Sequence, residues 1–220
     1  RRVLPLKQQV LGDNHPSTLT TMNNFALLLR ARKQLPEAEE TSRKAWEGRS
    51  RTLGERHPQS LSSMYNFALV VLDAGRRDEA QELLARNLTM RTTALGRSHP
   101  ETLATRGALG RVYKEQGRVE EAIRTWRELL DAGSALGDGN PLMVSARRDV
   151  GLCLTAKGDY PGAETELLRA WIARKAIVSA SDPTLARLAT ALADLYSAWG
   201  KPDEAAKYRP ASTLAAPPAK

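Results

Sequence analysis

Leu53-Gly54-Glu55-Arg56-His57-Pro58 is the stretch of this sequence that recurs most clearly. Similar stretches begin at Leu11 and Leu95, which sets a period of 42 residues, and a weaker copy begins at Leu136. A fifth copy is reduced to Asp182-Pro183. A period of about 20 to 50 residues is the sequence signature of a solenoid, in which each repeat packs mainly on its neighbours. We therefore predict an array of repeats.

Composition and charge narrow the class of protein. The 220 residues include 33 Lys and Arg against 25 Asp and Glu, a formal charge of +8 that favours acidic partners and permits nucleic acid. Cys153 is the single cysteine, which rules out an internal disulfide framework and a cysteine metal site and is typical of a reducing compartment. No apolar run approaches the roughly 18 residues needed to cross a bilayer. No signal peptide is visible either, because the polar Lys7-Gln8-Gln9 follow Arg1-Arg2 where a signal peptide would have its apolar segment. We expect a cytoplasmic protein without membrane segments.

Each repeat is predicted to form two helices, A and B. Helix A begins at a proline that follows a capping residue, because proline suits the first helical position and pushes the residue before it into the extended geometry of an N-cap. The five capping residues are His15, His57, His99, Asn140 and Asp182. In the first repeat the apolar residues follow at spacings of three and four, which indicates one buried helix face: Leu19, Met22, Phe25, Ala26 and Leu29.

Helix B follows a turn that is marked by a glycine in four repeats: Gly75, Gly117, Gly158 and Gly200. Lys33 stands at this position in the first repeat, at little cost if the turn there avoids positive φ. Helix B carries a small residue at one fixed place, which we interpret as a close helix–helix contact: Ala38, Ala80, Ala122, Ala163 and Ala205. Gly54 and Gly96 are expected to close helix B in left-handed geometry, and the last helix B is expected to break at Arg209-Pro210.

These signals divide the chain into three parts. Residues 1–10 are predicted to be the end of a helix from a preceding repeat, which marks the chain as a fragment of a longer protein. Residues 11–209 form the array, in repeats that span 11–52, 53–94, 95–135, 136–177 and 178–209. Residues 210–220 have no periodicity and contain Pro217-Pro218, which predicts a disordered tail.

The aligned repeats resemble a known family. Asn23-Asn24-Phe25-Ala26-Leu27-Leu28 in helix A, Pro36-Glu37-Ala38-Glu39 in helix B and the Leu-Gly-x-x-His-Pro linker are similar to the tetratricopeptide repeat, in the 42-residue form of kinesin light chains and their bacterial relatives. The resemblance covers roughly residues 3–209. It implies an all-α, right-handed superhelical solenoid of about five antiparallel helix pairs. The last repeat also resembles the C-terminal end of bacterial proteins in which such repeats follow a serine/threonine kinase domain, although this chain has no kinase signature.

The resemblance also implies where a partner binds, because helix A lines the concave face in this family. The residues beside the packed face of helix A are then the candidate peptide-binding residues: Asn23, Leu27, Arg30, Tyr65, Leu69, Arg111, Lys114, Arg148 and Leu152. This mixture of apolar and basic groups suits an acidic peptide with an apolar anchor, since Arg forms bidentate bonds with carboxylates and the anchor supplies buried area. Asn24 and Asn66 are expected to join neighbouring helices by hydrogen bonds instead.

Other classes of function find less support. The histidines lie one repeat apart and cannot share a metal ion, and Cys153 has no neighbouring base that would make it a nucleophile. We predict no enzyme activity and no cofactor. Single-stranded nucleic acid binding is the alternative from another class, but Tyr65 is the one candidate stacking ring in the groove. Self-association, or regulation of an upstream catalytic domain by the array, are further alternatives.

Overall fold

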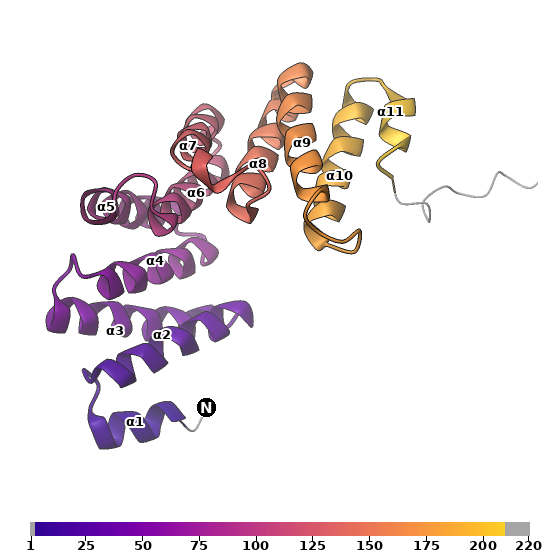
Figure 1. The fold of residues 1–220 in the computed structure, drawn as a ribbon. Coiled ribbons are helices and arrows are strands. Elements are labelled where there is room, and N and C mark those ends of the chain that lie inside the picture. Colours follow the sequence, from indigo (N-terminus) through magenta and orange to yellow (C-terminus); the bar gives the residue numbers. More distant parts are fainter. Residues whose placement is uncertain (1–2, 210–220) are drawn as a thin grey trace, which may run out of the picture. The chain divides into compact units, whose positions relative to one another are not determined.

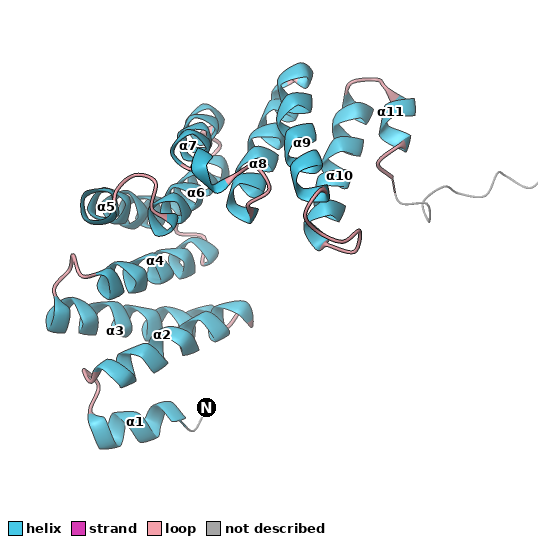
Figure 2. Cartoon of the chain, viewed as in Figure 1, coloured by secondary structure: helices cyan, strands magenta, loops and turns pink. Residues whose placement is uncertain are grey.

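The computed structural model describes residues 3–209, and this part of the chain is helical, with no strand (Figures 1 and 2). Eleven α-helices and one short 3-10 helix are described there. The α-helices are Val3–Leu11 (α1), Pro16–Ala31 (α2), Leu35–Leu53 (α3), Pro58–Asp73 (α4), Arg77–Leu95 (α5), Pro100–Glu115 (α6), Val119–Ala132 (α7), Pro141–Lys157 (α8), Tyr160–Lys175 (α9), Pro183–Ala198 (α10) and Pro202–Ala206 (α11). The all-α fold predicted from the repeats is confirmed. The expected disorder of residues 210–220 falls outside the described residues.

The chain divides into two compact units, residues 1–118 and residues 119–220. In unit 1 each helix from α2 to α6 packs against the next one along the chain, and α1 packs on α2. The A helices also contact one another directly, α2 with α4 and α4 with α6. In unit 2 the same serial packing runs from α7 to α11, and the A helices α8 and α10 touch. Both units are therefore built from antiparallel helix pairs stacked in chain order.

The start of every helix A agrees with the predicted cap. The side chains of His15, His57 and His99 each accept a hydrogen bond at Nδ1, over 3.2 Å, from the backbone N–H two residues further on. Asn140 and Asp182 accept the equivalent bond through their side-chain oxygens, over 2.9 and 2.8 Å. Each bond satisfies one of the backbone donors that a helix leaves without an internal partner at its first turn. The three histidines are therefore helix caps.

Two of the turns differ from expectation. Gly54 and Gly96 have positive φ, but their ψ angles of 152° and 160° place them in extended geometry rather than in the left-handed helical region. That combination is essentially restricted to glycine. Lys33 has positive φ as well, at 59°, like the glycines at the same place in the other repeats, so the condition under which a lysine costs little there is not met. A lysine there bears the steric cost of left-handed backbone.

The fixed small residue of helix B is fully buried in every repeat. Ala38, Ala80, Ala122, Ala163 and Ala205 all have 0% of their surface exposed. Full burial is what the predicted close packing at this position requires. The last helix B is shorter than predicted, because α11 ends at Ala206 rather than at Arg209.

Candidate functional site

Seven of the nine candidate residues lie on three neighbouring helices of unit 1. We call them the A-helix surface: Asn23, Leu27 and Arg30 of α2, Tyr65 and Leu69 of α4, and Arg111 and Lys114 of α6. Because α4 touches both α2 and α6, these residues belong to one run of adjacent helices. The remaining two, Arg148 and Leu152, lie on α8 in unit 2 and are described separately.

A hydrogen-bonded amide pair joins α2 to α4. Asn66 Nδ2 donates to Asn23 Oδ1 over 3.0 Å, and Ser63 Oγ donates to the same oxygen over 3.4 Å. The helix-joining role expected of Asn66 is confirmed. Asn24 is exposed and has no such bond among the described residues, so the same expectation is wrong for Asn24. Since both bonds end on the oxygen of Asn23, its amide N–H groups are left as donors for a further partner.

A carboxylate holds two of the candidate arginines together. Asp73 accepts a hydrogen bond from Arg30 Nε and another from Arg111 Nη2, each over 2.8 Å. Burial alone would raise the pKa of the Asp73 carboxyl, but the hydrogen bonds and positive charges of Arg30 and Arg111 outweigh burial and leave the pKa lowered. Arg111 also bonds to Glu115 Oε1 over 2.8 Å through Nε. The two arginines are thus held in place by carboxylates of unit 1 itself.

The arginine charge on this surface is consequently partly compensated. Among the described residues, Arg30 uses its Nε for Asp73, which leaves its terminal nitrogens for another acceptor. Lys114, one turn along α6 from Arg111, is exposed. An acidic ligand would therefore meet Lys114 and the outer N–H groups of Arg30 first. It would compete with Asp73 and Glu115 for Arg111.

The apolar part of the surface is graded from open to buried. Leu27 is 38% exposed. Leu69 and Tyr65 are half-buried and pack against the core cluster that contains Phe67 and Leu72. The guanidinium carbon of Arg91 lies 5.1 Å from the centre of the Tyr65 ring, and burial raises the pKa of the Tyr65 hydroxyl. Leu27 is the residue of this set best placed to bury area against a ligand, whereas one face of Tyr65 is already covered by Arg91.

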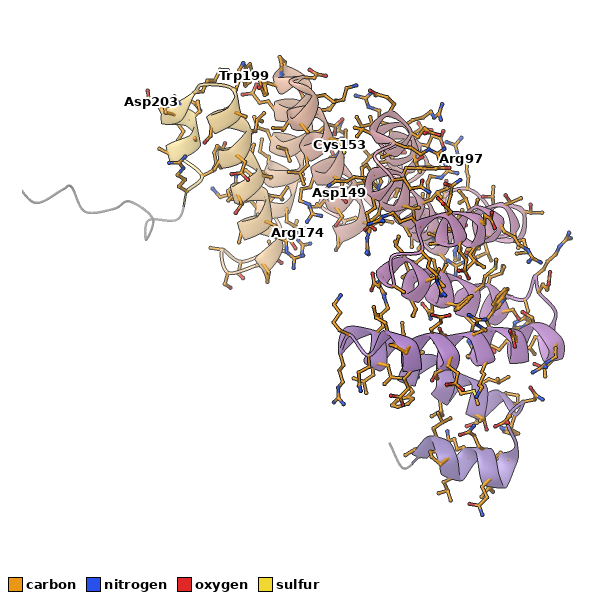
Figure 3. All side chains as sticks on the ribbon, turned by 180° about the vertical axis from the view of Figure 1, so that it is seen from behind. Arg97, Asp149, Cys153, Arg174, Trp199 and Asp203 are labelled. Carbon is orange, nitrogen blue, oxygen red and sulfur yellow. The ribbon has the colours of Figure 1, made fainter. Side chains whose placement is uncertain are left out.

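The two candidates in unit 2 have their own surroundings. Arg148 donates to Asp149 Oδ1, the carboxylate of the next residue in α8, from Nη2 over 2.8 Å and from Nε over 3.2 Å. Leu152 is half-buried, and the neighbouring Cys153 is buried as a small core residue. Figure 3 labels Asp149 and Cys153 on this helix. Arg148, like Arg30 and Arg111, therefore already bonds a carboxylate.

Two sets of residues were missed by sequence reasoning. The first is Asp73, whose role depends on three helices meeting and is not visible in α4 alone.

The second is a series of arginines near the end of helix B that bond to the start of the next helix A. Arg49 donates to Ser63 Oγ over 2.9 Å, and Arg91, 42 residues later, donates to Thr105 Oγ1 over 2.8 Å. Arg174 donates to Asp182, the cap of α10, over 2.9 Å; it lies at the opposite end of the α9–α10 pair from Trp199 (Figure 3). The 42-residue recurrence of arginine was the available signal.

The described residues contain neither a candidate metal site nor a candidate membrane span. Within residues 3–209, no group of three or more His, Cys, Asp or Glu side chains could hold a metal ion. In the same part of the chain no helix is long and apolar enough to span a membrane.

The repeats match models of a known family. A family model of the tetratricopeptide repeat matches residues 23–91 and 59–135, and a second model of the same repeat matches residues 108–179. The chain belongs to the tetratricopeptide repeat family. No curated protein matches it significantly. The match to the family models confirms the family predicted from the linker and the helix pattern.

Several solved structures are similar to most of this chain. A Podospora anserina protein named as a kinesin light chain, with nearly identical repeats, is 25% identical, with a TM-score of 0.75 over 88% of this chain and 92% of that one. BtubC of P. vanneervenii is 19% identical, with a TM-score of 0.77 over 98% of this chain and 89% of that one. YrrB, described as having an unusual peptide-binding site, is 18% identical, with a TM-score of 0.53 over 85% of this chain and 80% of that one. The first agrees with the kinesin-light-chain-like form of the repeat, and the other two share the fold.

Proposed function

We propose that this tetratricopeptide repeat protein is a non-enzymatic scaffold that binds an extended segment of a partner protein on the A-helix surface. Tetratricopeptide repeat proteins act in general as protein-interaction scaffolds. The observation that carries the proposal is the contiguity of α2, α4 and α6, which brings an open apolar residue, amide donors and a lysine onto one run of helices.

The proposed ligand is an acidic peptide with an apolar anchor. Leu27 supplies exposed apolar surface, and Asn23, Arg30 and Lys114 supply donors that suit carboxylates. Asp73 and Glu115 weaken the preference for acidic ligands, because they already accept hydrogen bonds from N–H groups of Arg30 and Arg111. A ligand with a few well-placed carboxylates around an anchor therefore fits better than a uniformly acidic one.

Binding of single-stranded nucleic acid is the alternative to this proposal. Base stacking needs open aromatic faces, and sequence-independent single-strand binders use several of them. Tyr65, the one candidate ring, has Arg91 over it and is half-buried. This arrangement favours a protein ligand.

Four further properties stay predictions: a cytoplasmic location, a bacterial source, self-association and regulation of an upstream domain.

The test begins with a displayed library of random peptides selected on the whole chain. Selected peptides are synthesised with a fluorophore, and their dissociation constants are measured by anisotropy. The double variant Leu27→Asp, Lys114→Glu changes two exposed residues and is expected to weaken binding by about tenfold or more, as for residues at the centre of an interface. The matched control is Arg86→Glu, on an exposed site of α5 in the same unit.

The outcomes separate the proposal from its rivals. Selection of peptides with an apolar residue flanked by Asp or Glu, together with loss of binding in the double variant but not in the control, supports it. Equal binding by the double variant contradicts the assignment of the surface. Failure of the library combined with tight, salt-sensitive binding of a labelled single-stranded oligonucleotide would move the function to nucleic acid.

A further inference from the structure

A hollow of ≈ 550 Å³ lies in unit 2 against α9 and α10, which are neighbours in Figure 1. Its apolar lining includes Trp171 of α9 and Leu185, Ala186 and Ala189 of α10. Tyr208, in the turn after α11, also lines it, and the Tyr208 and Trp171 rings meet edge to face with centres 5.7 Å apart. The hollow is therefore an apolar depression beside a helix, with an ordered aromatic wall.

The corresponding place is covered in every preceding repeat. Ala186 is the fourth residue after the cap Asp182, and the residues at this position in the preceding repeats are Leu19, Leu61, Leu103 and Val144. They are at most 2% exposed, whereas Ala186 is exposed. In the first repeat the cover comes from the second half of helix B, because Gly48 of α3 lies directly against Leu19 and Ala45 belongs to the same buried cluster. The hollow thus lies where the second half of helix B lies in the first repeat.

The last helix B turns away before it reaches this place. The position four residues after the fixed alanine is buried in the first four repeats, where it holds Ser42, Leu84, Trp126 and Leu167. In the last repeat this position holds Arg209, which is exposed. Helix α11 ends at Ala206, and Arg209 Nη2 donates to Ser197 Oγ of α10 over 3.1 Å. The described residues of the last helix B therefore leave Ala186 uncovered.

The charged side chains in the lining are all basic. Lys175, at the end of α9, and Arg209 both line the hollow, and no described Asp or Glu does. Both cations are exposed, and the Lys175 ammonium lies 5.9 Å from the centre of the Trp171 ring. Opposite charges on two binding surfaces favour association and specify the partner. The charge of the lining therefore favours a ligand that brings carboxylates to these cations.

We propose that the hollow binds an acidic amphipathic helix of a partner protein, in the place that the second half of helix B takes in the first repeat. Binding of a helix by its apolar face in a groove is a common mode of peptide recognition. This second site lies in unit 2 and does not depend on the A-helix surface of unit 1.

The size of the side chains on α10 specifies the apolar face of the partner helix. In the first repeat, the large Leu19 and Met22 of α2 form a buried cluster with Ala45 of α3, and Gly48 adjoins it. Two alanines of α10, at positions 186 and 189, stand where α2 has this leucine and methionine. Close packing then requires the opposite distribution of volume. The partner helix needs large apolar residues where α3 has its small ones.

The first repeat also indicates where the partner needs an acid. Gln8 of α1 and Lys44 of α3 line one hollow of unit 1. Gln8 stands seven residues before the cap His15, as Lys175 stands seven residues before the cap Asp182. A helix in the place of α3 would therefore bring the residue at the position of Lys44 close to Lys175. A carboxylate at that position forms an ion pair.

The probe is a synthetic peptide with the sequence of residues 38–53, a fluorophore, and the changes Lys44→Glu, Ala45→Leu and Gly48→Leu. Its dissociation constant with the whole chain is measured by anisotropy. The matched peptide carries Lys44→Glu and Gly48→Ala and keeps Ala45, which preserves helix propensity but removes apolar volume. We expect the matched peptide to bind at least about tenfold more weakly, because two large apolar side chains are no longer buried.

Changes in the protein locate the probe. Ala186→Asp introduces a charge into the lining at an exposed position and is expected to weaken binding at least about tenfold, since the charge opposes burial of the apolar face. Ala198→Asp, at an exposed position of α10 outside the lining, is the control and should leave the affinity nearly unchanged. Circular dichroism shows whether both variants keep the fold.

A charge exchange tests the ion pair. A probe that keeps Lys44 should bind the wild-type chain about two- to fivefold more weakly than the probe with Lys44→Glu, as for an exposed ion pair. Lys175→Glu should reverse this order of affinity. Arg187→Glu, which lies on α10 but outside the lining, should not reverse it.

Three results would overturn the proposal. The first is the absence of saturable binding, or binding that Ala186→Asp leaves unchanged. The second is loss of binding in Leu27→Asp, Lys114→Glu, which would place the probe on the A-helix surface and leave the proposed function intact. The third is growth of the chain's mass with concentration in sedimentation, abolished by Ala186→Asp and by Leu6→Asp on the exposed side of α1, which would mean that a second copy covers the hollow.

Discussion

At the scale of single residues, backbone geometry and local charge decide what each position tolerates. Lys33 adopts the positive φ that glycine adopts at the same turn of the other repeats. Asp73 joins Arg30 and Arg111, and its pKa is lowered by them. Changes at both residues are expected to alter the free energy of unfolding.

Lys33→Gly is expected to stabilise the chain by about 1 kcal/mol, because an L-residue in left-handed geometry costs about 1–2 kcal/mol and glycine does not bear this cost. The midpoint of urea unfolding measures the effect. Lys33→Ala is the control, since alanine keeps the Cβ and should give no comparable gain. An equal gain from alanine would show that the lysine side chain, rather than φ, is responsible.

Asp73→Asn is expected to lower stability by about 1 kcal/mol at pH 7, since it weakens two charge-assisted hydrogen bonds, one of them to the 43%-exposed Arg111. The folded-state pKa of Asp73 is lowered, so its contribution is present above the usual aspartate pKa of about 3.9 and is lost as the pH falls through the folded value. The difference between wild type and variant should therefore be constant from pH 7 to about 5 and shrink below about 4. Urea unfolding across this range, with Glu82→Gln as control, checks the sign. A difference that grows in acid would contradict it.

At the scale of helices, buried arginines join one helix pair to the next pair along the chain. Arg91, 2% exposed, donates from α5 to the backbone carbonyl of Glu101 over 2.9 Å and to Thr105 on α6. Burial lowers the pKa of this guanidinium, partly offset by Glu101. Gly133 stands 42 residues after Arg91, so the contact is not repeated at the end of α7.

Arg91→Ala should destabilise the fold by about 1–3 kcal/mol, because it leaves buried acceptors on α6 without their donor. Arg86→Ala is the matched control: the same helix carries this arginine, but its ion pair with Glu55 is half-exposed and should contribute less than about 1 kcal/mol. Chemical unfolding of both variants measures the contrast. Equal effects would mean that burial of Arg91 contributes nothing.

Ala80→Leu should cost about 1–3 kcal/mol, since overpacking a filled contact forces side chains or backbone to move. Ala80 has 0% of its surface exposed, whereas Ala94 in the same helix is exposed. Ala94→Leu is therefore expected to leave the unfolding midpoint nearly unchanged. A harmless Ala80→Leu would refute the close-contact interpretation of the fixed alanine.

At the scale of the whole molecule, local signals predicted the fold well and the site less well. The prolines and their caps fixed where helices begin, because both act through their own backbone, and all five A helices begin at the expected proline. The φ angle of Lys33 was left open because lysine itself does not indicate a left-handed turn. The compensation of Arg30 and Arg111 was missed because Asp73 meets them only after α2, α4 and α6 have packed.

The central claim is that a protein segment binds the A-helix surface of unit 1. The most direct test is amide hydrogen exchange of the whole chain with and without a peptide selected from the displayed library. Binding on this surface predicts slower exchange in α2, α4 and α6 around Asn23, Leu27, Leu69 and Lys114, and little change in α3 and α5. Protection confined to α3 and α5, or to unit 2, would contradict the claim.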